Sequence, residues 1–466
     1  MVSQQASRLV AGSPAIAEAH FRAEASPYHP RLRPDGYLNL GTAENRLVQD
    51  LHEARVSRHR SLTGLTGLTG LTGPAGSAGP AGPREFTERD TRYAPLHGTP
   101  ELRERIARLL TRVCRYPVDA ENLVVVGGAT AALDVIATAL CDPGDAIVVP
   151  APYYGAFDTD LAGRSGAWLL PAPSAASDGF RPSAEAVDRV IADARRDGVT
   201  VRAVALASPA NPTGYVLSPA DLRELSEVAA YHDVDVIADE IYAGSVFGPE
   251  PFTSLLTVAA RPSRIHTVWG FAKDFGLPGF KVGVLHTRDP ELRAAARALA
   301  YFAPVSTHTQ AFLTDLLADP GWVDGFLAEN RRRLGASYEL AAALLDTFDV
   351  PYVPAGAGCS LWADLSSRLP HPGFAGERAL HRTVLDRTHV SILPGEAFHS
   401  PEPGWFRVCH SLDAALVREA LTRLGHLLTS PAPDSPPPDS PPRNTSHRNG
   451  ATHDDGRRRT STVAEP

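Results

Sequence analysis

The stretch Gly270-Phe-Ala-Lys-Asp-Phe-Gly-Leu-Pro-Gly-Phe-Lys-Val-Gly283 contains both lysines of this 466-residue chain, Lys273 and Lys281. All other cationic side chains among its 45 lysines and arginines are arginines. A lysine amine can lose its proton and attack a carbonyl group, whereas an arginine guanidinium stays protonated. An arginine-rich composition can leave two lysines by chance, but their clustering in one glycine-rich turn favours a chemical role.

Apolar runs typical of buried strands flank this stretch and recur upstream, separated by segments with helical periodicity. This alternation predicts an α/β domain with a mostly parallel sheet, in which Lys273 follows the carboxyl end of a strand. A smaller domain is expected toward the C-terminus, from a helix-rich stretch at 304–347, a strand at 360–364 and a helix at 414–428. The strands expected in the larger domain are 123–126, 146–149, 201–207, 234–238, 265–268 and 282–286, and a helix is expected over 101–113.

Three more of the expected strands end in polar residues that suit a phosphorylated ring compound. Asp239, followed by Tyr242, can pair with a protonated ring nitrogen. The amide of Asn211 can donate to a phenolic oxygen. The helix start at Gly-Gly-Ala129-Thr130 offers backbone amides and a hydroxyl to a phosphate. Each feature alone is a common turn or capping sequence, but together with the lysine they predict four strand ends around one ligand.

This order of motifs resembles the fold type I family of pyridoxal-phosphate enzymes, and further motifs resemble its 1-aminocyclopropane-1-carboxylate synthase branch. The resemblance runs from about residue 35 to 428. It implies an α/β, PLP-dependent transferase fold type I, with a mostly parallel seven-stranded sheet in a large domain and a smaller α+β domain. It also implies pyridoxal 5'-phosphate as cofactor and a homodimer. The motifs are Gly36–Asn45, His97–Arg103, Gly127–Ala132, Asp142–Asp145, Pro150–Tyr154, Asp239–Gly244 and Pro403–Cys409.

The resemblance assigns the catalytic roles to Lys273, Asp239 and Tyr242. Lys273 would bind the cofactor covalently and move the proton at the substrate's α-carbon. Asp239 would keep the pyridine nitrogen protonated, so that the ring accepts carbanion charge. Asn211 and Tyr242 would bind the phenolic oxygen, and Tyr154, rather than its neighbour Tyr153, would stack on the ring.

The remaining implied roles concern the phosphate and the substrate. Ala129, Thr130 and Lys281 would hold the phosphate. Arg407 would bind the substrate carboxylate through a bidentate fork, the alternative being a surface arginine near a helix start. In the synthase branch the glutamate that corresponds to Glu44 lies near the sulfonium of S-adenosylmethionine, and a helix-capping acid is the alternative here. Tyr93 stands where aminotransferases have a tyrosine that reaches across a dimer interface.

The chain also departs from the family pattern. The family usually has Ser-x-Ser before the lysine, where this chain has Gly270-Phe-Ala272. Lys281 stands where the family has an arginine, which replaces a planar fork by a point charge. Leu96 replaces the aromatic residue that usually precedes His-Gly. These changes keep the carbonyl chemistry of Lys273 but loosen the phosphate cup, so that simple cyclopropane formation need not be the whole reaction.

The expected activity is therefore α-deprotonation of S-adenosylmethionine with expulsion of methylthioadenosine from the γ-carbon. Ring closure would follow, or capture of a vinylglycine-type intermediate by a second substrate, in bacterial secondary metabolism. An amino acid aminotransferase that uses a 2-oxo acid is the alternative. A non-catalytic regulator would need a DNA-binding module, and the first 35 residues are too short and too weakly basic to supply one.

Composition excludes other ligand classes. A formal net charge of −8 leaves no basic footprint for nucleic acid, and no apolar run is long enough to span a membrane. The four cysteines are far apart, which disfavours a disulfide framework and a zinc site, and no metal ligands are expected. A cytoplasmic enzyme fits these features.

The expected organisation has five parts, and three segments stand apart by composition: the N-terminal arm, the insertion at 62–83 and the tail. Residues 62–83 repeat Leu-Thr-Gly and then Pro-Ala-Gly, which predicts a loop insertion rather than a collagen-like segment. The run Glu329–Arg333 is expected to be a solvated helix face. The parts are a mobile N-terminal arm (1–34), the N-terminal part of the small domain with this insertion (35–92), the large cofactor-binding domain (93–303), the C-terminal small domain (304–429) and a disordered tail (430–466).

Overall fold

The computed structural model describes residues 15–55 and 92–430. The first helix in this part of the chain, α2, spans Ala15–Ala25. The glycine-repeat insertion at 62–83 and residues 431–466 of the tail lie outside the described residues, so the expectations for them stay predictions.

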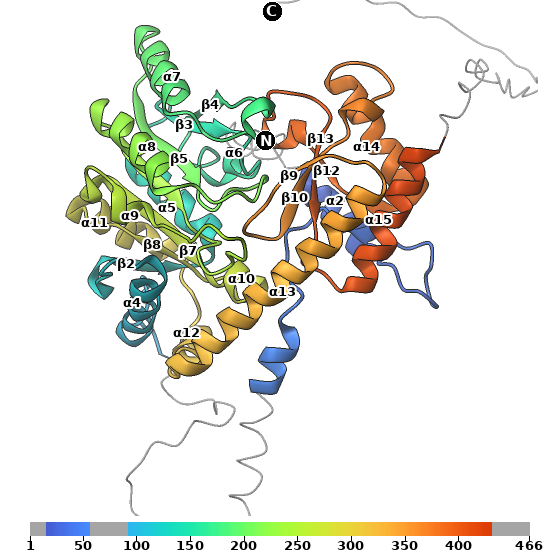
Figure 1. Ribbon diagram of the computed structural model, residues 1–466. Coiled ribbons are helices and arrows are strands. Elements are labelled where there is room, and N and C mark those ends of the chain that lie inside the picture. The colour runs from blue at the N-terminus through green and yellow to red at the C-terminus, as the bar shows by residue number, and fades with distance from the viewer. Residues whose placement is uncertain (1–14, 56–91, 431–466) are drawn as a thin grey trace, which may run out of the picture. The chain divides into compact units, whose positions relative to one another are not determined.

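The larger sheet has seven strands in the order β2-β8-β7-β6-β5-β3-β4 (Figure 1). β8 alone runs opposite to the other six strands, which confirms the mostly parallel sheet. The edge strand β4 was not expected. Its sequence, Trp-Leu-Leu-Pro-Ala-Pro, is apolar but contains two prolines, which weaken a strand pattern and are tolerated at a sheet edge. The strands are β2 Leu123–Val126, β3 Ala146–Ala151, β4 Trp168–Pro173, β5 Val201–Ala207, β6 Asp235–Asp239, β7 Ile265–Gly270 and β8 Gly283–His286.

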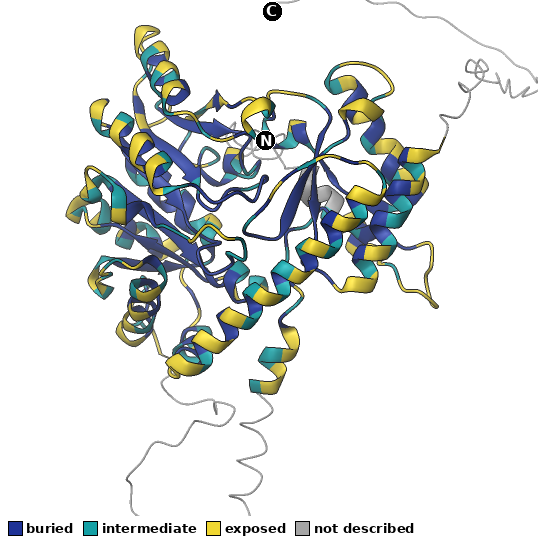
Figure 2. Ribbon diagram, in the orientation of Figure 1, coloured by how far each residue is buried: buried dark blue, intermediate teal, exposed yellow. Residues whose placement is uncertain are grey.

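Helices cover both faces of this sheet, which is why its central strands are buried (Figure 2). One face packs against α5 (Ala129–Leu140) and α11 (Pro290–Leu299). On the other face, one half packs against α7 (Ala184–Arg196), α8 (Pro219–Tyr231) and α9 (Leu255–Val258). The half around β2 and β8 packs against α4 (Pro100–Cys114) and α12 (Thr307–Leu316).

The C-terminal elements form a second, antiparallel sheet in the order β12-β13-β10-β9. Its core includes residues of α14 (Phe374–Thr388) and α15 (Ala414–Thr429). The N-terminal segment packs in the same core through Leu38 and Leu40, and its β1 (Leu38–Asn39) pairs in parallel with β11 (Val390–Ser391) as a separate two-stranded sheet. The four strands are β9 Tyr352–Val353, β10 Ser360–Asp364, β12 Leu393–Pro394 and β13 Trp405–Cys409.

Helix α13 (Pro320–Thr347) links the two sheets. Its 28 residues span about 42 Å. Phe326 in its first half packs in the core under β2 and β8, and Leu345 in its last turn packs in the core of the second sheet. The N-terminus of the helix is well capped. The Asp319 side chain accepts a hydrogen bond from the Trp322 amide, and Pro320 occupies the first turn.

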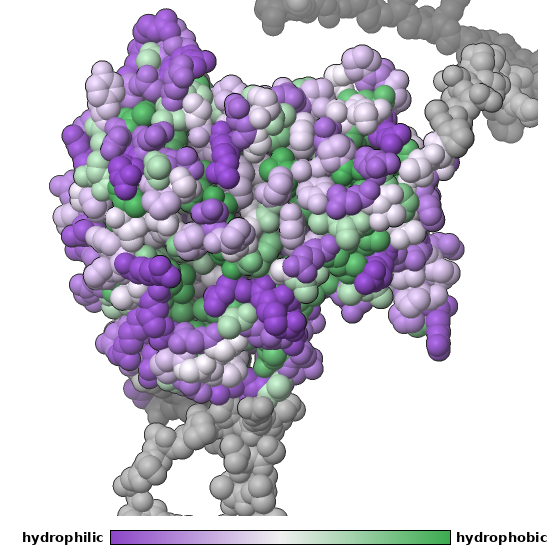
Figure 3. Space-filling model, in the orientation of Figure 1, coloured by the Kyte–Doolittle hydropathy of each residue, from purple (hydrophilic) through white to green (hydrophobic). Residues whose placement is uncertain are grey.

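Hydrophilic residues line much of the rim of the face shown in Figure 3. Within 15–55 and 92–430, no helix is both long enough and apolar enough to cross a bilayer.

Candidate active site

Lys273 lies in the one-turn helix α10 (Phe271–Asp274), which directly follows β7. Its Nζ donates a hydrogen bond to the carbonyl oxygen of Ala43. Burial lowers the pKa of Lys273, and the guanidinium of Arg407 acts in the same direction. A lower pKa increases the fraction of neutral amine, which is the form that attacks carbonyl groups.

Asp239 is the last residue of β6 and is 6% exposed. Its Oδ1 accepts a hydrogen bond from the Ile241 amide at 3.2 Å. Burial raises the pKa of Asp239 to about 7, which means that its surroundings do not compensate the carboxylate charge. A protonated ring nitrogen would supply that compensation, so the residue fits the role expected for it.

The first turn of α5 forms the expected phosphate end of the site. Gly128 precedes this helix with φ 104°, and a Cβ there would lie 3.4 Å from both Cε and Nζ of Lys281. The Lys281 ammonium therefore lies at a helix N-terminus, where both the helix dipole and the lysine favour an anion. Gly283 allows β8 to approach this turn, because a Cβ on it would lie 2.2 Å from the Gly128 carbonyl carbon.

The hydroxyl of Thr130 has a hydrogen-bond partner that was not expected. It does not point freely into the anion site but donates a hydrogen bond to Oδ2 of Asp160 at 3.2 Å. Asp160 ends the short helix α6 (Phe157–Asp160) and is buried. The sequence pattern did not single out this carboxylate.

Two adjacent tyrosines have different surroundings. Tyr153 donates a hydrogen bond to Oδ1 of Asp158 at 2.8 Å, and its ring stacks on His399 with 4.5 Å between centroids. Tyr154 is affected by the charges of Arg407 and Asp239, and burial raises the pKa of its phenol. The Tyr154 phenol thus interacts with charged groups of the candidate site, whereas Tyr153 is bound to Asp158 and His399. The choice of Tyr154 to stack on the ring stays a prediction.

Tyr242 lies deeper in the same region. Its side chain is buried against Cys359 and Cys409, and burial raises the pKa of its phenol. A Cβ on Gly358 would lie 3.7 Å from the tyrosine ring, so this glycine lies against it. The phenol therefore remains protonated and can donate a hydrogen bond.

Arg407 lies on β13 and is only 1% exposed, so the alternative of a surface arginine is wrong. Its Nη1 donates to Oδ1 of Asn211 at 3.0 Å, and its Nη2 donates to the carbonyl oxygen of Gly41 at 2.7 Å. The guanidinium carbon lies 4.7 Å from the centroid of the Phe398 ring. Its Nε has no hydrogen-bond partner among the described residues, which leaves a buried donor for a carboxylate.

Glu44 and Tyr93 lie in more exposed places. Oε2 of Glu44 accepts a hydrogen bond from Nε of Arg46 at 2.7 Å, and Arg46 also pairs with Glu24 at 3.1 Å. Glu44 caps no helix in the part of the chain described, so that alternative is not supported. Tyr93 is fully exposed and lines a surface pocket with Thr99 and Thr307.

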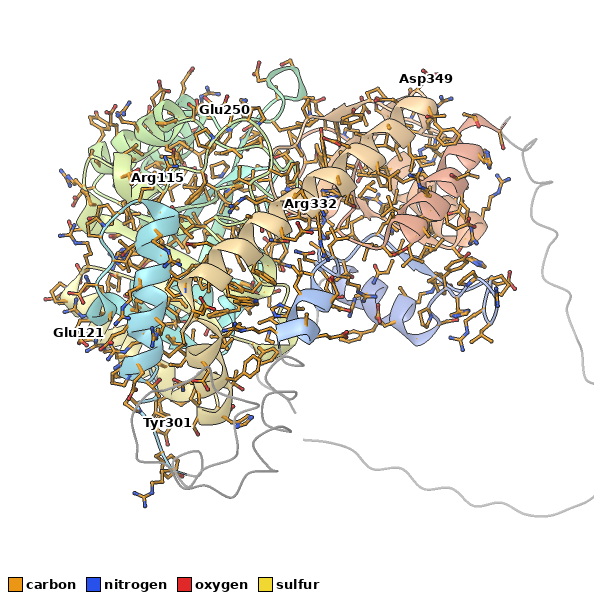
Figure 4. All side chains as sticks on the ribbon, turned by 60° about the horizontal axis from the view of Figure 1, so that its bottom comes forward. Arg115, Glu121, Glu250, Tyr301, Arg332 and Asp349 are labelled. Atoms are coloured by element: carbon orange, nitrogen blue, oxygen red, sulfur yellow. The ribbon has the colours of Figure 1, made fainter. Side chains whose placement is uncertain are left out.

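Sequence reasoning missed a buried polar link to α13. Arg332 is exposed on that helix as expected (Figure 4), but its neighbour Asn330 is buried. Oδ1 of Asn330 accepts from Asn45 at 2.7 Å, and its Nδ2 donates to the carbonyl oxygen of Asp274 at 3.1 Å. The link connects the segment next to Glu44 to α10, the helix that contains Lys273. In the sequence, the only sign of it was the position of Asn330 on the helix.

Comparisons with known proteins agree with this arrangement. The class I and II aminotransferase family matches residues 71–424. 1-Aminocyclopropane-1-carboxylate synthase 6 of Arabidopsis thaliana is 33% identical over 409 residues, which cover 86% of this chain and 80% of that protein. 1-Aminocyclopropane-1-carboxylate synthase 2 of Solanum lycopersicum is 34% identical, with 86% and 82% covered.

Solved structures show the same fold. The aspartate aminotransferase of Thermus thermophilus with maleate has a TM-score of 0.72 and 23% identity, and the match covers 92% of this chain and 99% of that chain. The aspartate aminotransferase of Thermotoga maritima has a TM-score of 0.69, with 92% and 100% covered. The expected fold type I is thus confirmed, and so is the expected cofactor. The chain belongs to the pyridoxal-phosphate-dependent class I and II aminotransferase family, and most of its length is similar to 1-aminocyclopropane-1-carboxylate synthases.

Proposed function

We propose that this enzyme acts on S-adenosylmethionine, removes its α-proton and expels methylthioadenosine from the γ-carbon. The product then forms by ring closure or by capture of the remaining fragment by a second substrate. One observation carries the proposal: the short segment Gly41–Glu44 contacts both Lys273, through the Ala43 carbonyl, and Arg407, through the Gly41 carbonyl. A carboxylate on that segment is well placed to meet a cationic sulfonium on a substrate held at both residues.

In this mechanism Arg407 holds the substrate carboxylate and so orients the α-hydrogen toward Lys273. The neutral amine of Lys273 then takes the α-proton, a role that its lowered pKa favours. Pyridoxal phosphate, when bound, supplies the electron sink for the charge left on the α-carbon. Glu44 stabilises the sulfonium until methylthioadenosine leaves, and the substrate competes with Arg46 for this carboxylate.

The remaining residues hold the cofactor. Asp239 binds the ring nitrogen, Asn211 and Tyr242 bind the phenolic oxygen, and Tyr154 covers the ring face. The phosphate end is formed by Ala129, Thr130 and Lys281. We further propose a cytoplasmic homodimer, in which Tyr93 of one chain reaches the site of the other, with a role in bacterial secondary metabolism.

Product analysis tests the proposal. The purified holoenzyme is incubated with S-adenosylmethionine, alone and with candidate nucleophilic acceptors, and methylthioadenosine is quantified. The proposal expects release by the parent enzyme and none by Lys273→Ala, which retains the remaining side chains. Absence of methylthioadenosine, together with amino transfer to a 2-oxo acid, would instead establish an ordinary aminotransferase, which the similar solved structures and Tyr93 favour.

A further inference from the structure

A buried carboxylate lies at the end of the site where a phosphate is expected. Asp160 is 6% exposed, and its Oδ2 accepts the hydrogen bond of the Thr130 hydroxyl at 3.2 Å. Thr130 is in the first turn of α5, next to Gly128 and the Lys281 ammonium. None of the roles proposed above uses Asp160, and a second anion in an anion site demands a physical explanation.

The charges around Asp160 do not neutralise it. Burial raises the pKa of Asp160 to about 6, although Thr130 and Lys281 both lower it. Asp134 on α5 opposes its ionisation and is itself paired with Arg164 at 2.9 Å. Two further groups of the site interact with its charge, Asp239 on β6 and the phenol of Tyr154. Asp158, on the same short helix, binds Tyr153 and His399 instead.

We propose that Asp160 is a cofactor-positioning residue that takes up one proton when the cofactor phosphate binds, so that the enzyme retains its cofactor less tightly as pH rises. A carboxylate and a phosphate dianion in a buried site cannot both keep their charge when a single ammonium faces them. Protonated Asp160 no longer competes for the Thr130 hydroxyl, which then donates to the phosphate. The inference rests on the assignment of Thr130 and Lys281 to the phosphate, and it holds whichever substrate the enzyme uses.

The direction of the pH effect separates the titration of Asp160 from those of Lys273 and the phosphate. Lys273 attacks a carbonyl only as a neutral amine, so its titration favours cofactor attachment as pH rises. A free phosphate monoester gains its second charge near pH 6, and that change also favours binding beside Lys281 at higher pH. A group that must gain a proton on binding weakens retention between pH 6.5 and 8.5, which is above the value of about 6 for Asp160. The cofactor's ring nitrogen, bound in its protonated form, would act in the same direction, and the Asp160→Asn variant separates the two.

The experiment measures cofactor retention, not turnover. The full-length holoenzyme is diluted at pH 6.5 and at pH 8.5, and the dissociation constant of pyridoxal phosphate is obtained from the absorbance of the bound cofactor. One proton taken up can weaken binding by up to a hundredfold over these two pH units, and the titrations of Lys273 and the phosphate oppose it, so the parent should bind about tenfold more weakly at the higher pH. Asp160→Asn should bind more tightly than the parent at pH 8.5 and lose the decline with pH.

Asp158→Asn is the matched control, because it removes a carboxylate from the same helix that does not face the phosphate end. It should follow the parent's pH dependence. A parent whose affinity is constant or rises with pH overturns the inference, and this result needs no variant to fold. An Asp160→Asn protein that declines in parallel with the parent, or that loses its cofactor at both pH values, overturns it as well. Because no substrate is added, a failure of the proposed reaction leaves these outcomes unaffected.

Discussion

Burial acts in opposite directions on the two ionisable groups that define this active site. It lowers the pKa of Lys273 and raises the pKa of Asp239, because a low dielectric disfavours whichever form is charged. A larger fraction of the lysine is thereby in the neutral form, which accepts protons and attacks carbonyl groups. The aspartate becomes a carboxyl group whose charge is stable only when a cation binds next to it.

Asp239→Asn should make the cofactor-free protein more stable at alkaline pH. With a folded-state pKa of about 7, Asp239 binds a proton in the folded chain that the unfolded chain has already lost above pH 4. Stability therefore falls as pH rises from about 4 to 7, and the asparagine removes this contribution. We expect the free energy of unfolding of the variant, relative to the parent, to rise by about 2 kcal/mol between pH 5 and pH 8. Urea unfolding at both pH values checks this, and an equal difference at both would contradict it.

Lys281→Arg should retain the cofactor and change the distribution of products. The residue has φ 51° and its ammonium lies beside Gly128, so an arginine restores a planar fork in the same anion site. A phosphate held by a planar fork would be fixed in orientation, so the ring attached to it would have less freedom to move. That change should alter how the intermediate divides between ring closure and capture by a second substrate. Chromatography of the products measures their ratio, with cofactor content as the control. An unchanged ratio would show that the lysine is a neutral replacement.

The proposed phosphate site depends on the junction of two elements, β8 and α5. The N-terminus of α5 is useful only if Lys281, which lies two residues before β8, comes next to it. Gly283 makes this possible by the absence of a side chain, because the two backbones meet where a Cβ would be.

Gly283→Ala should weaken cofactor binding at least tenfold and destabilise the protein by about 1–3 kcal/mol, because its Cβ would force β8 away from α5. Gly279→Ala is the control from the same segment, since a Cβ there meets no atom within 4 Å in the described structure. Cofactor titration and thermal unfolding measure the two effects. Equal behaviour of the two variants would mean that the junction relaxes without cost.

Asn330→Ala tests the hydrogen-bonded link between α13 and α10, the helix that contains Lys273. It leaves the Asn45 amide and the Asp274 carbonyl without their buried partner, which should cost about 1–3 kcal/mol in the free energy of unfolding. Arg332→Ala on the exposed side of the same helix should leave that free energy unchanged. Urea denaturation compares the two variants, and similar curves would rule out a structural role for the link.

Considered as a whole, the described chain brings residues from its seven-stranded and four-stranded sheets to the proposed site. Lys273, Asp239 and Thr130 come from the larger sheet and its helices, whereas Arg407 comes from the smaller sheet. Helix α13 contributes to the cores of both. Tyr93 has no place in this set within one chain, because it is fully exposed.

Hybrid dimers test whether Tyr93 completes the site of a second subunit. Lys273→Ala and Tyr93→Ala chains are each expected to be inactive or weakly active alone. In a hybrid of the two, one site combines the intact lysine with the intact tyrosine. Mixing equal amounts, with reversible unfolding to exchange subunits, should restore about a quarter of the parent's activity, because half of the dimers are hybrids with one complete site each. Hybrids without restored activity would place Tyr93 outside the partner's site.

The sequence predicted the features that depend on neighbours along the chain. Buried strands are apolar runs, and polar residues that follow them directly must lie at strand ends, so the positions of Asp239, Asn211 and Lys273 followed from local patterns. The family motifs then supplied the cofactor. The edge strand β4 was not predicted because Pro171 and Pro173 interrupt the strand pattern of an otherwise apolar run.

Contacts between distant segments were decided by the tertiary structure alone. Asp160 and Thr130 are 30 residues apart, and Asn330 and Asn45 are 285 apart, so no local pattern couples them. Arg407 was identified by its motif, but its burial against Asn211 and Gly41 depends on how the two sheets pack. The physical reason is that secondary structure reflects short-range periodicity, whereas the charge state of a buried group depends on every segment that packs around it.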